Sequence, residues 1–176
     1  MERALDILDH IGFQVTRVVL SLCAIVFAIC FLLLVADISG RYIFGYPLQR
    51  VSETVTISFI WVFFLGAAAL YARSEDISVD ALFELMPERI KALWLLAISL
   101  AIAVTMALIL QETLKLIHVQ RRVLTPLLRL PLGVQHAGLA VAAGLIVFSS
   151  LIDAFACVVW LARGRRPARR KLELID

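Results

Sequence analysis

The side chain in this 176-residue chain that most suggests chemistry is Asp153, the only acidic residue well inside a long apolar run. Runs of that length cross bilayers, and a carboxylate within the membrane is a candidate functional group by default. One interpretation is proton or sodium coupling. The other is a structural contact with Ser or Gln, or with Arg17, Arg73 or Lys91 from the cytoplasmic end. We favour the structural role, because ion sites need several converging oxygens and no second buried carboxylate is evident.

The histidines and cysteines are weaker candidates for a functional site. His118 and His136 raise the idea of a bis-histidine haem, but axial ligands must lie at comparable depth on facing helices, and His118 is expected outside the hydrocarbon. Cys23, Cys30 and Cys157 all lie in apolar runs without ligand spacing, which indicates packing residues. No Ser-His-Asp set, phosphate-binding loop or carboxylate pair is present, so we expect no enzyme, no metal and no cofactor.

The elements that must position these side chains are four apolar segments. Hydrophobic residues form 62% of the chain, and its mean hydropathy is +0.95. A helix rises about 1.5 Å per residue, so roughly 20 residues cross a hydrocarbon core of about 30 Å. The sequence therefore predicts an all-α membrane protein with four transmembrane helices, crossing at about residues 18–36, 54–72, 92–111 and 135–161.

Composition excludes several classes of protein. No soluble core of this size could bury all four runs, and the strands of a membrane β-barrel are short and alternate in polarity. The pI near 9.0 does not indicate nucleic-acid binding, because six of the 17 basic residues cluster in a tail directly after the last run. The first run lacks a small-x-small cleavage site and follows acidic residues, so we interpret it as a retained helix.

Charge predicts the orientation. Four crossings place both termini and the middle loop on one side, which carries eleven of the 17 Lys and Arg residues against six on the other. The positive-inside rule then puts both termini in the cytoplasm. Residues 1–17 form an amphipathic lead-in that lies in the interface or extends the first helix, residues 18–162 the transmembrane domain, and residues 163–176 a basic cytoplasmic tail.

The connecting loops carry turn and cap signals. Gly45 to Pro47 predicts a turn, Ser52 a cap for the second helix, and Glu53 a favourable charge in its first turn. A stripe over 79–86, flanked by Asp80, predicts a short amphipathic helix on the cytoplasmic interface. Thr125-Pro126 is expected to stop the third helix and Pro131–Gly133 to make a second break.

Small residues predict where helices contact one another. Gly66 to Ala69 on the second run and Ala140 to Gly144 on the fourth would let helices approach closely, within this chain or with a partner.

One region resembles a known family. Asp37-Ile-Ser-Gly-Arg-Tyr-Ile-Phe-Gly-Tyr-Pro-Leu48 is followed by Glu53, by Trp61-Val-Phe-Phe-Leu-Gly-Ala67, and then by Arg73 and Ile77-Ser-Val-Asp80. This order resembles the four-helix small membrane subunit of the tripartite ATP-independent periplasmic (TRAP) transporters, densely over 37–82 and loosely elsewhere. The chain departs from the family pattern at Arg50, Ser52 and Asp76, where Trp, an acidic residue and His are frequent.

The resemblance implies an accessory role in the inner membrane of a bacterium. In such systems a periplasmic binding protein delivers an organic acid, and a large multi-helix membrane subunit moves it with sodium. We expect this chain to brace the large subunit, so sodium would bind in that partner. Arg41 and Glu53 would organise the periplasmic end, by pairing with each other or with the large subunit, and Asp80 the cytoplasmic end. Gly66 and Asp153 complete the candidate interface or structural polar residues.

Two competing functions stay open at this point. One is a membrane anchor subunit for a redox or signalling complex, which visible haem absorbance would favour. The other is a homo-oligomeric small transporter or channel, which transport by the chain alone would favour. Small four-helix exporters carry a carboxylate within their first helix, and the first run here has none.

Overall fold

The computed structural model describes residues 2–43, 45, 49–73 and 87–163, and within them the chain is almost wholly helical. Four helices follow one another: α1 (Glu2–Ile43), α2 (Gln49–Arg73), α4 (Glu88–Gln120) and α5 (Gly133–Arg163). Each contains a segment long and apolar enough to cross a membrane, namely Thr16–Ile43, Arg50–Ala72, Arg89–Gln120 and Gly133–Ala162. The prediction of an all-α protein with four transmembrane helices is confirmed.

The helices extend beyond the apolar runs. α1 runs without a break from Glu2, so the amphipathic lead-in continues the first crossing helix. α4 ends at Gln120, five residues before the expected stop at Thr125-Pro126, and α5 begins at Gly133. The expected interfacial helix at 79–86, with Asp80, and the tail after Arg163 lie outside the described residues.

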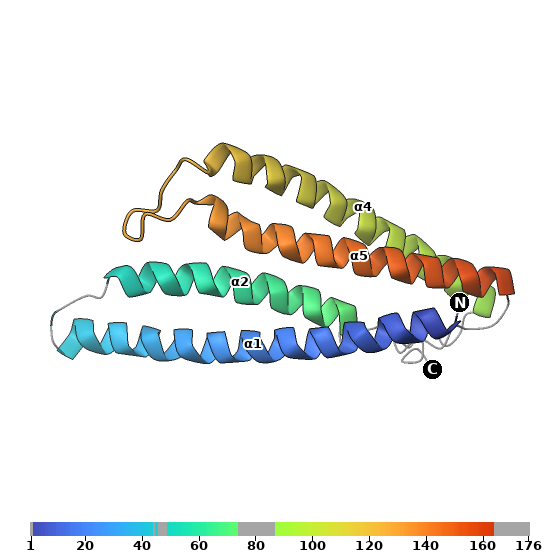
Figure 1. The fold of residues 1–176 in the computed structure, drawn as a ribbon, viewed down its shortest axis with the longest axis horizontal. Helices are drawn as coiled ribbons and strands as arrows, with labels where there is room; N and C mark the ends of the chain where they lie inside the picture. The colour runs from blue at the N-terminus through green and yellow to red at the C-terminus, as the bar shows by residue number, and fades with distance from the viewer. Residues whose placement is uncertain (1, 44, 46–48, 74–86, 164–176) are drawn as a thin grey trace.

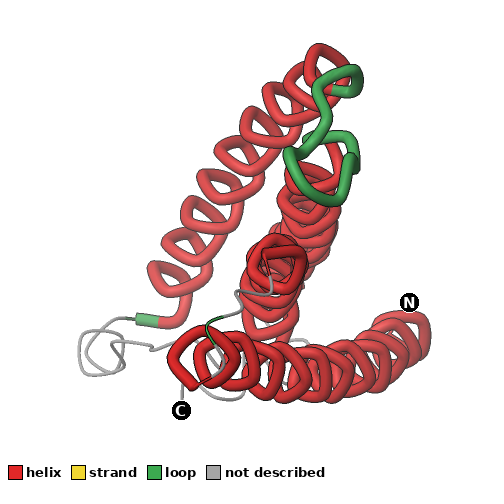
Figure 2. Tube along the Cα trace, turned by 90° about the vertical axis from the view of Figure 1, so that its left-hand side faces the viewer, coloured by secondary structure: helices red, strands yellow, loops and turns green. Residues whose placement is uncertain are grey.

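The helices are arranged in a row with the order α1, α2, α5, α4. α1 packs on α2, α2 on α5, and α5 on α4. All four run along the long axis, with the start of α1 and the end of α5 at one end of the molecule (Figure 1). Seen at right angles, α4 leans away from α5, and α1 points away on another side (Figure 2). The row does not close into a bundle around a common axis.

The molecule has two ends along its helix axes. We call the end that holds the start of α1 and the end of α5 the terminal end. The opposite end, where α1 leads into α2 and α4 leads into α5, is the loop end.

The contact between α1 and α2 follows a seven-residue repeat. Thr16, Cys30 and Asp37 are buried and Cys23 is half-buried, each seven residues from the next. A seven-residue period keeps one stripe of a helix against its neighbour, as in left-handed coiled coils. Phe27 of α1 also lies against Phe59 of α2, with ring centroids 5.6 Å apart. Most of the rest of α1 is exposed, since α2 is its main neighbour.

Helices α5 and α4 meet through small side chains. Ala156 and Ala92 are almost fully buried, and Trp160 closes their cluster. Small residues allow close helix approach in a membrane, where large apolar side chains gain nothing by leaving lipid. The predicted packing role of the small patches is confirmed for five alanines: Ala68, Ala69, Ala140, Ala142 and Ala143.

Candidate functional site at the loop end

The connection between α4 and α5 is a compact hairpin over residues 121–132. Leu124 and Pro131 pair as an isolated antiparallel bridge, and the Leu132 N–H donates to the Val123 carbonyl at 2.9 Å. The Thr125 N–H donates to the Leu130 carbonyl at 2.8 Å. The connection expected to hold two helix breaks is therefore an ordered loop with its own hydrogen bonds.

Thr125 and Arg129 shape the tip of this hairpin. The buried Thr125 hydroxyl accepts the Leu130 N–H at 3.1 Å, and the Thr125 carbonyl accepts the Arg129 N–H at 3.2 Å. Arg129 has a φ of 53°, in the left-handed region that side chains other than Gly seldom adopt. The tip keeps this conformation because hydrogen bonds on both sides of Arg129 fix the backbone.

Glu53 of α2 fastens the hairpin to the row. Its Oε2 accepts the N–H groups of Leu127 and Leu128 at 3.0 and 2.9 Å. Hydrogen bonds to an ionised carboxylate are shorter and stronger than neutral ones. Oε1 is buried and accepts no hydrogen bond within the described part of the chain. The site thus joins α2 to a loop more than 70 residues later in sequence.

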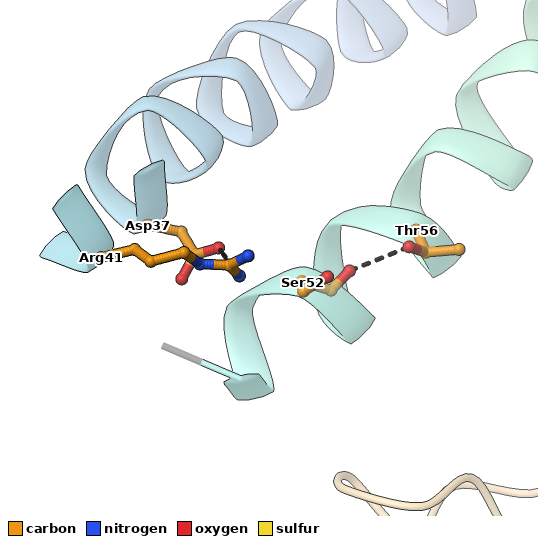
Figure 3. A network of polar contacts seen from close by, with 4 residues as sticks. All are labelled: Asp37, Arg41, Ser52 and Thr56. Carbon is orange, nitrogen blue, oxygen red and sulfur yellow. Dashed lines mark hydrogen bonds and ion pairs between the residues drawn. The ribbon is translucent and has the colours of Figure 1, made fainter. Parts of the chain in front are cut away.

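The predicted cap of α2 is wrong. α2 begins at Gln49, so Ser52 lies inside the helix, where its carbonyl accepts the Thr56 hydroxyl at 2.9 Å (Figure 3). For the same reason Glu53 lies beyond the first turn, which holds no acidic residue. The Glu53 carboxylate accepts hydrogen bonds from N–H groups of the hairpin and not from those at the start of its own helix.

Arg41 pairs with Asp37, one turn earlier on α1. Their side chains lie 3.4 Å apart, and the Asp37 carboxylate is buried while the Arg41 guanidinium is half exposed. Both side chains lie on the part of α1 that faces the first turns of α2, near Ser52 (Figure 3). The structure therefore gives Arg41 and Glu53 separate partners, and the expected alternative of a direct pair between them is not the observed contact.

Trp61 forms a second link between α2 and α5. Its indole N–H donates to the Val134 carbonyl at 3.0 Å. Gly138 lies against the same ring, because a Cβ there would come within 3.2 Å of Trp61 Cδ2. On the other side of α5, His136 Nε2 and Gln120 Oε1 are 2.8 Å apart and tie α5 to the end of α4. The loop end is thus held by α2, α4, α5 and the hairpin together.

Asp153 lies far from this site, toward the terminal end of α5. It is buried, as are Ser150 on α5 and Lys91 on α4, and both Asp153 and Lys91 make a polar or electrostatic contact within the chain. The Ser150 Oγ is 2.9 Å from the Tyr71 hydroxyl of α2. The structural role of Asp153 stays a prediction. In the described ranges no three metal-ligating side chains lie together.

Gly66 is not part of the loop end. A Cβ added at Gly66 would meet nothing within 4 Å, so this glycine faces out of the row and not into a contact within the chain. Asp80 lies outside the described residues.

Sequence reasoning missed the contacts that hold the loop end. The Thr125 hydroxyl, the Trp61 N–H and the Asp37 carboxylate were not assigned these partners. A local signal existed for Asp37, since Arg41 follows it at the i,i+4 spacing of helical ion pairs. No local pattern identifies the partner of Trp61, because Val134 lies on a segment distant in sequence.

The comparison with known families decides what kind of protein this is. The family described as tripartite ATP-independent periplasmic transporters, DctQ component, matches residues 30–159. The chain belongs to the DctQ family. No curated protein sequence matches it.

Membership of the DctQ family makes the chain the small permease component of a TRAP transporter, a multi-pass membrane protein. The DctQ family is a transporter component and not an enzyme family. The match includes α2, α4, the hairpin and most of α5, so the contacts of the loop end lie within the family region.

Proposed function

We propose that this DctQ-family chain braces the large membrane subunit of its transporter during sodium-coupled import of an organic acid. A periplasmic binding protein delivers the solute, and the large subunit binds both solute and sodium. The small subunit extends the fixed part of the assembly within the bilayer. Both termini face the cytoplasm, so the loop end faces the periplasm, in agreement with eleven of 17 basic residues on the terminal side.

The open row of helices carries this proposal. Transport sites are built at the membrane midplane, from broken helices whose free backbone groups bind the substrate. Here α1, α2, α4 and α5 cross unbroken, and the contacts between them hold small side chains such as Ala92, Ala142 and Ala156. A row of this kind suits an accessory subunit that packs beside a moving partner and does not itself enclose a transport pathway.

Large apolar side chains cover the outward surfaces of the row. Leu32 of α1, Phe63 of α2 and Phe148 of α5 are each more than 60% exposed. Such surfaces face lipid or another apolar helix, and part of them is available to the large subunit. Gly66 adds an open position on α2 where a partner helix could approach closely.

Recovery of the complex tests the proposal. We expect a pull-down of this chain from its native membrane in gentle detergent to recover a large polytopic membrane protein in stoichiometric amount, identified by mass. Recovery of the chain alone, or only with copies of itself, would contradict the accessory role and favour a homo-oligomer. Haem absorbance in the purified material would favour a redox anchor instead.

The role of the loop end is tested within the same complex. We expect Arg41→Ala and Glu53→Ala to weaken complex formation or solute uptake, because each removes a charged group that shapes this end. The matched control is Lys115→Ala, which breaks an exposed ion pair within α4. If both variants assemble and transport like the parent chain, neither residue organises the interface.

A further inference from the structure

The hairpin over residues 121–132 presents a surface that its internal hydrogen bonds do not explain. Arg121, Arg122 and Arg129 are all exposed, and the segment contains no acidic residue. Three basic side chains within nine residues make this the most basic short segment of the loop end. The nearest acidic group, Glu53, is already engaged by backbone N–H groups of the tip.

Exposed apolar side chains lie between the arginines. Val123, Leu124, Leu127 and Leu130 are each about 40–50% exposed. An apolar side chain left in water costs free energy that its burial would recover. A short water-facing loop would be expected to carry polar residues at these positions. The mixture of arginine and leucine is instead typical of segments that lie at a membrane interface.

The hairpin is held close to the bilayer surface at both ends. The candidate membrane span of α4 ends at Gln120 and that of α5 begins at Gly133, so residues 121–132 connect two crossing helices directly. The bridge between Leu124 and Pro131 keeps the hairpin short, and Glu53 fastens its tip to α2. The arginines and leucines are therefore presented beside the ends of the candidate membrane spans of α2 and α5.

We propose that this hairpin is a lipid-binding element, which inserts its leucines into the interface and pairs its arginines with the phosphates of anionic phospholipids. Guanidinium groups bind phosphate oxygens through paired N–H donors. The excess of arginine also explains why this side keeps basic residues despite the positive-inside bias. The inference concerns the chain itself and does not depend on the proposed accessory role.

A lipid fits this surface better than a soluble protein partner. An acidic protein surface would complement the arginines, but it would leave the four apolar side chains in water or require an apolar patch of its own. An anionic bilayer supplies both partners within a few ångströms, phosphate outside and hydrocarbon inside. Charge and apolar character together therefore favour the bilayer.

The first test measures lipid preference of the full-length chain in nanodiscs. Spin-labelled phosphatidylglycerol and phosphatidylcholine report which lipid is held at the protein surface. We expect the R121Q/R122Q double variant to lose preference for phosphatidylglycerol, by up to roughly fivefold per arginine. The matched control, R50Q/K115Q, removes two exposed charges from the loop end outside the hairpin and should keep most of that preference.

The second test keeps the arginines and measures depth. A spin label at Leu127→Cys, in a background with Cys23, Cys30 and Cys157 replaced, should collide with oxygen more than with a water-soluble nickel complex. Equal phosphatidylglycerol preference in both double variants, or a label in water, would overturn the proposal. Loss of a protein partner by R121Q/R122Q with unchanged lipid preference would equally overturn it and make the hairpin a protein-docking surface.

Discussion

At the scale of single residues, Glu53 makes the contacts that hold the hairpin to α2 at the loop end. Its carboxylate holds two backbone N–H groups of the hairpin tip, which would otherwise point away from any helix or strand partner. Arg41 and Asp37 form an ion pair within one turn of α1. Arg41 and Glu53, which the sequence analysis assigned together to the periplasmic end, thus have different structural roles.

We predict that Glu53→Ala loosens the hairpin. Without the carboxylate, the amides of Leu127 and Leu128 lose their acceptor and should exchange with deuterium faster, as measured by mass spectrometry of the purified chain. Glu53→Gln should have a smaller effect, because its amide oxygen still accepts but carries no charge. Glu112→Ala, which removes an exposed carboxylate paired with Lys115 on α4, is the control. Equal exchange in Glu53→Ala and the parent chain would refute the contact.

At the scale of the elements, small residues decide how closely the helices approach. Gly138 of α5 lies under the ring of Trp61, whereas Gly144, less than two turns later, meets nothing within 4 Å. The hydroxyl pair of Tyr71 and Ser150 adds an interhelical hydrogen bond, worth about 0.6 kcal/mol in a membrane. Contacts between α2 and α5 thus depend on a few specific positions.

These two glycines give a matched pair of substitutions. Gly144→Ala should stabilise the chain by up to about 1 kcal/mol, because alanine favours helix and the added methyl group meets open space. Gly138→Ala should be less stable than Gly144→Ala by about 1–3 kcal/mol, because the methyl group must displace the Trp61 ring. Unfolding in mixed detergent, followed by tryptophan fluorescence, measures both. Identical unfolding of the two variants would show that Gly138 and Trp61 are not in close contact.

At the scale of the whole molecule, the open row leaves most apolar surface outside. α1 has α2 as its main neighbour, and the large side chains of α1 point outward over much of its length. A soluble protein could not tolerate this arrangement. In a bilayer, a leucine side chain is as well surrounded by lipid hydrocarbon as by a neighbouring helix. The open row can therefore persist in the bilayer, where its two broad apolar faces contact lipid or the large subunit.

The shape of the row predicts a topology that labelling can test. Because α1 starts and α5 ends at one end of the molecule, that end and the loop end lie on opposite sides of the membrane. We expect a membrane-impermeant maleimide to label Arg50→Cys and Arg122→Cys in intact spheroplasts, and to label Arg89→Cys only after permeabilisation. The parent chain, whose cysteines lie in crossing helices, is the control. Labelling of Arg89→Cys from outside would reverse the proposed orientation.

The sequence alone determined the fold class and the family. The length of an apolar run is a local property, so four crossings could be counted without knowing any contact. The residues from Asp37 to Asp80 carried the resemblance, and the family match over 30–159 confirmed it. The small patches also indicated where helices approach, since only small residues permit it.

Only the tertiary structure decided the order of the helices and the partners of Glu53, Trp61 and Tyr71. Each of these side chains contacts a residue more than 70 positions away. Such pairs depend on the order and rotation of the helices, which hydropathy does not encode, because lipid and helix interior are equally apolar. The hairpin was hidden for a related reason: its Pro and Thr residues marked breaks, but the carboxylate that fixes its tip lies on another helix.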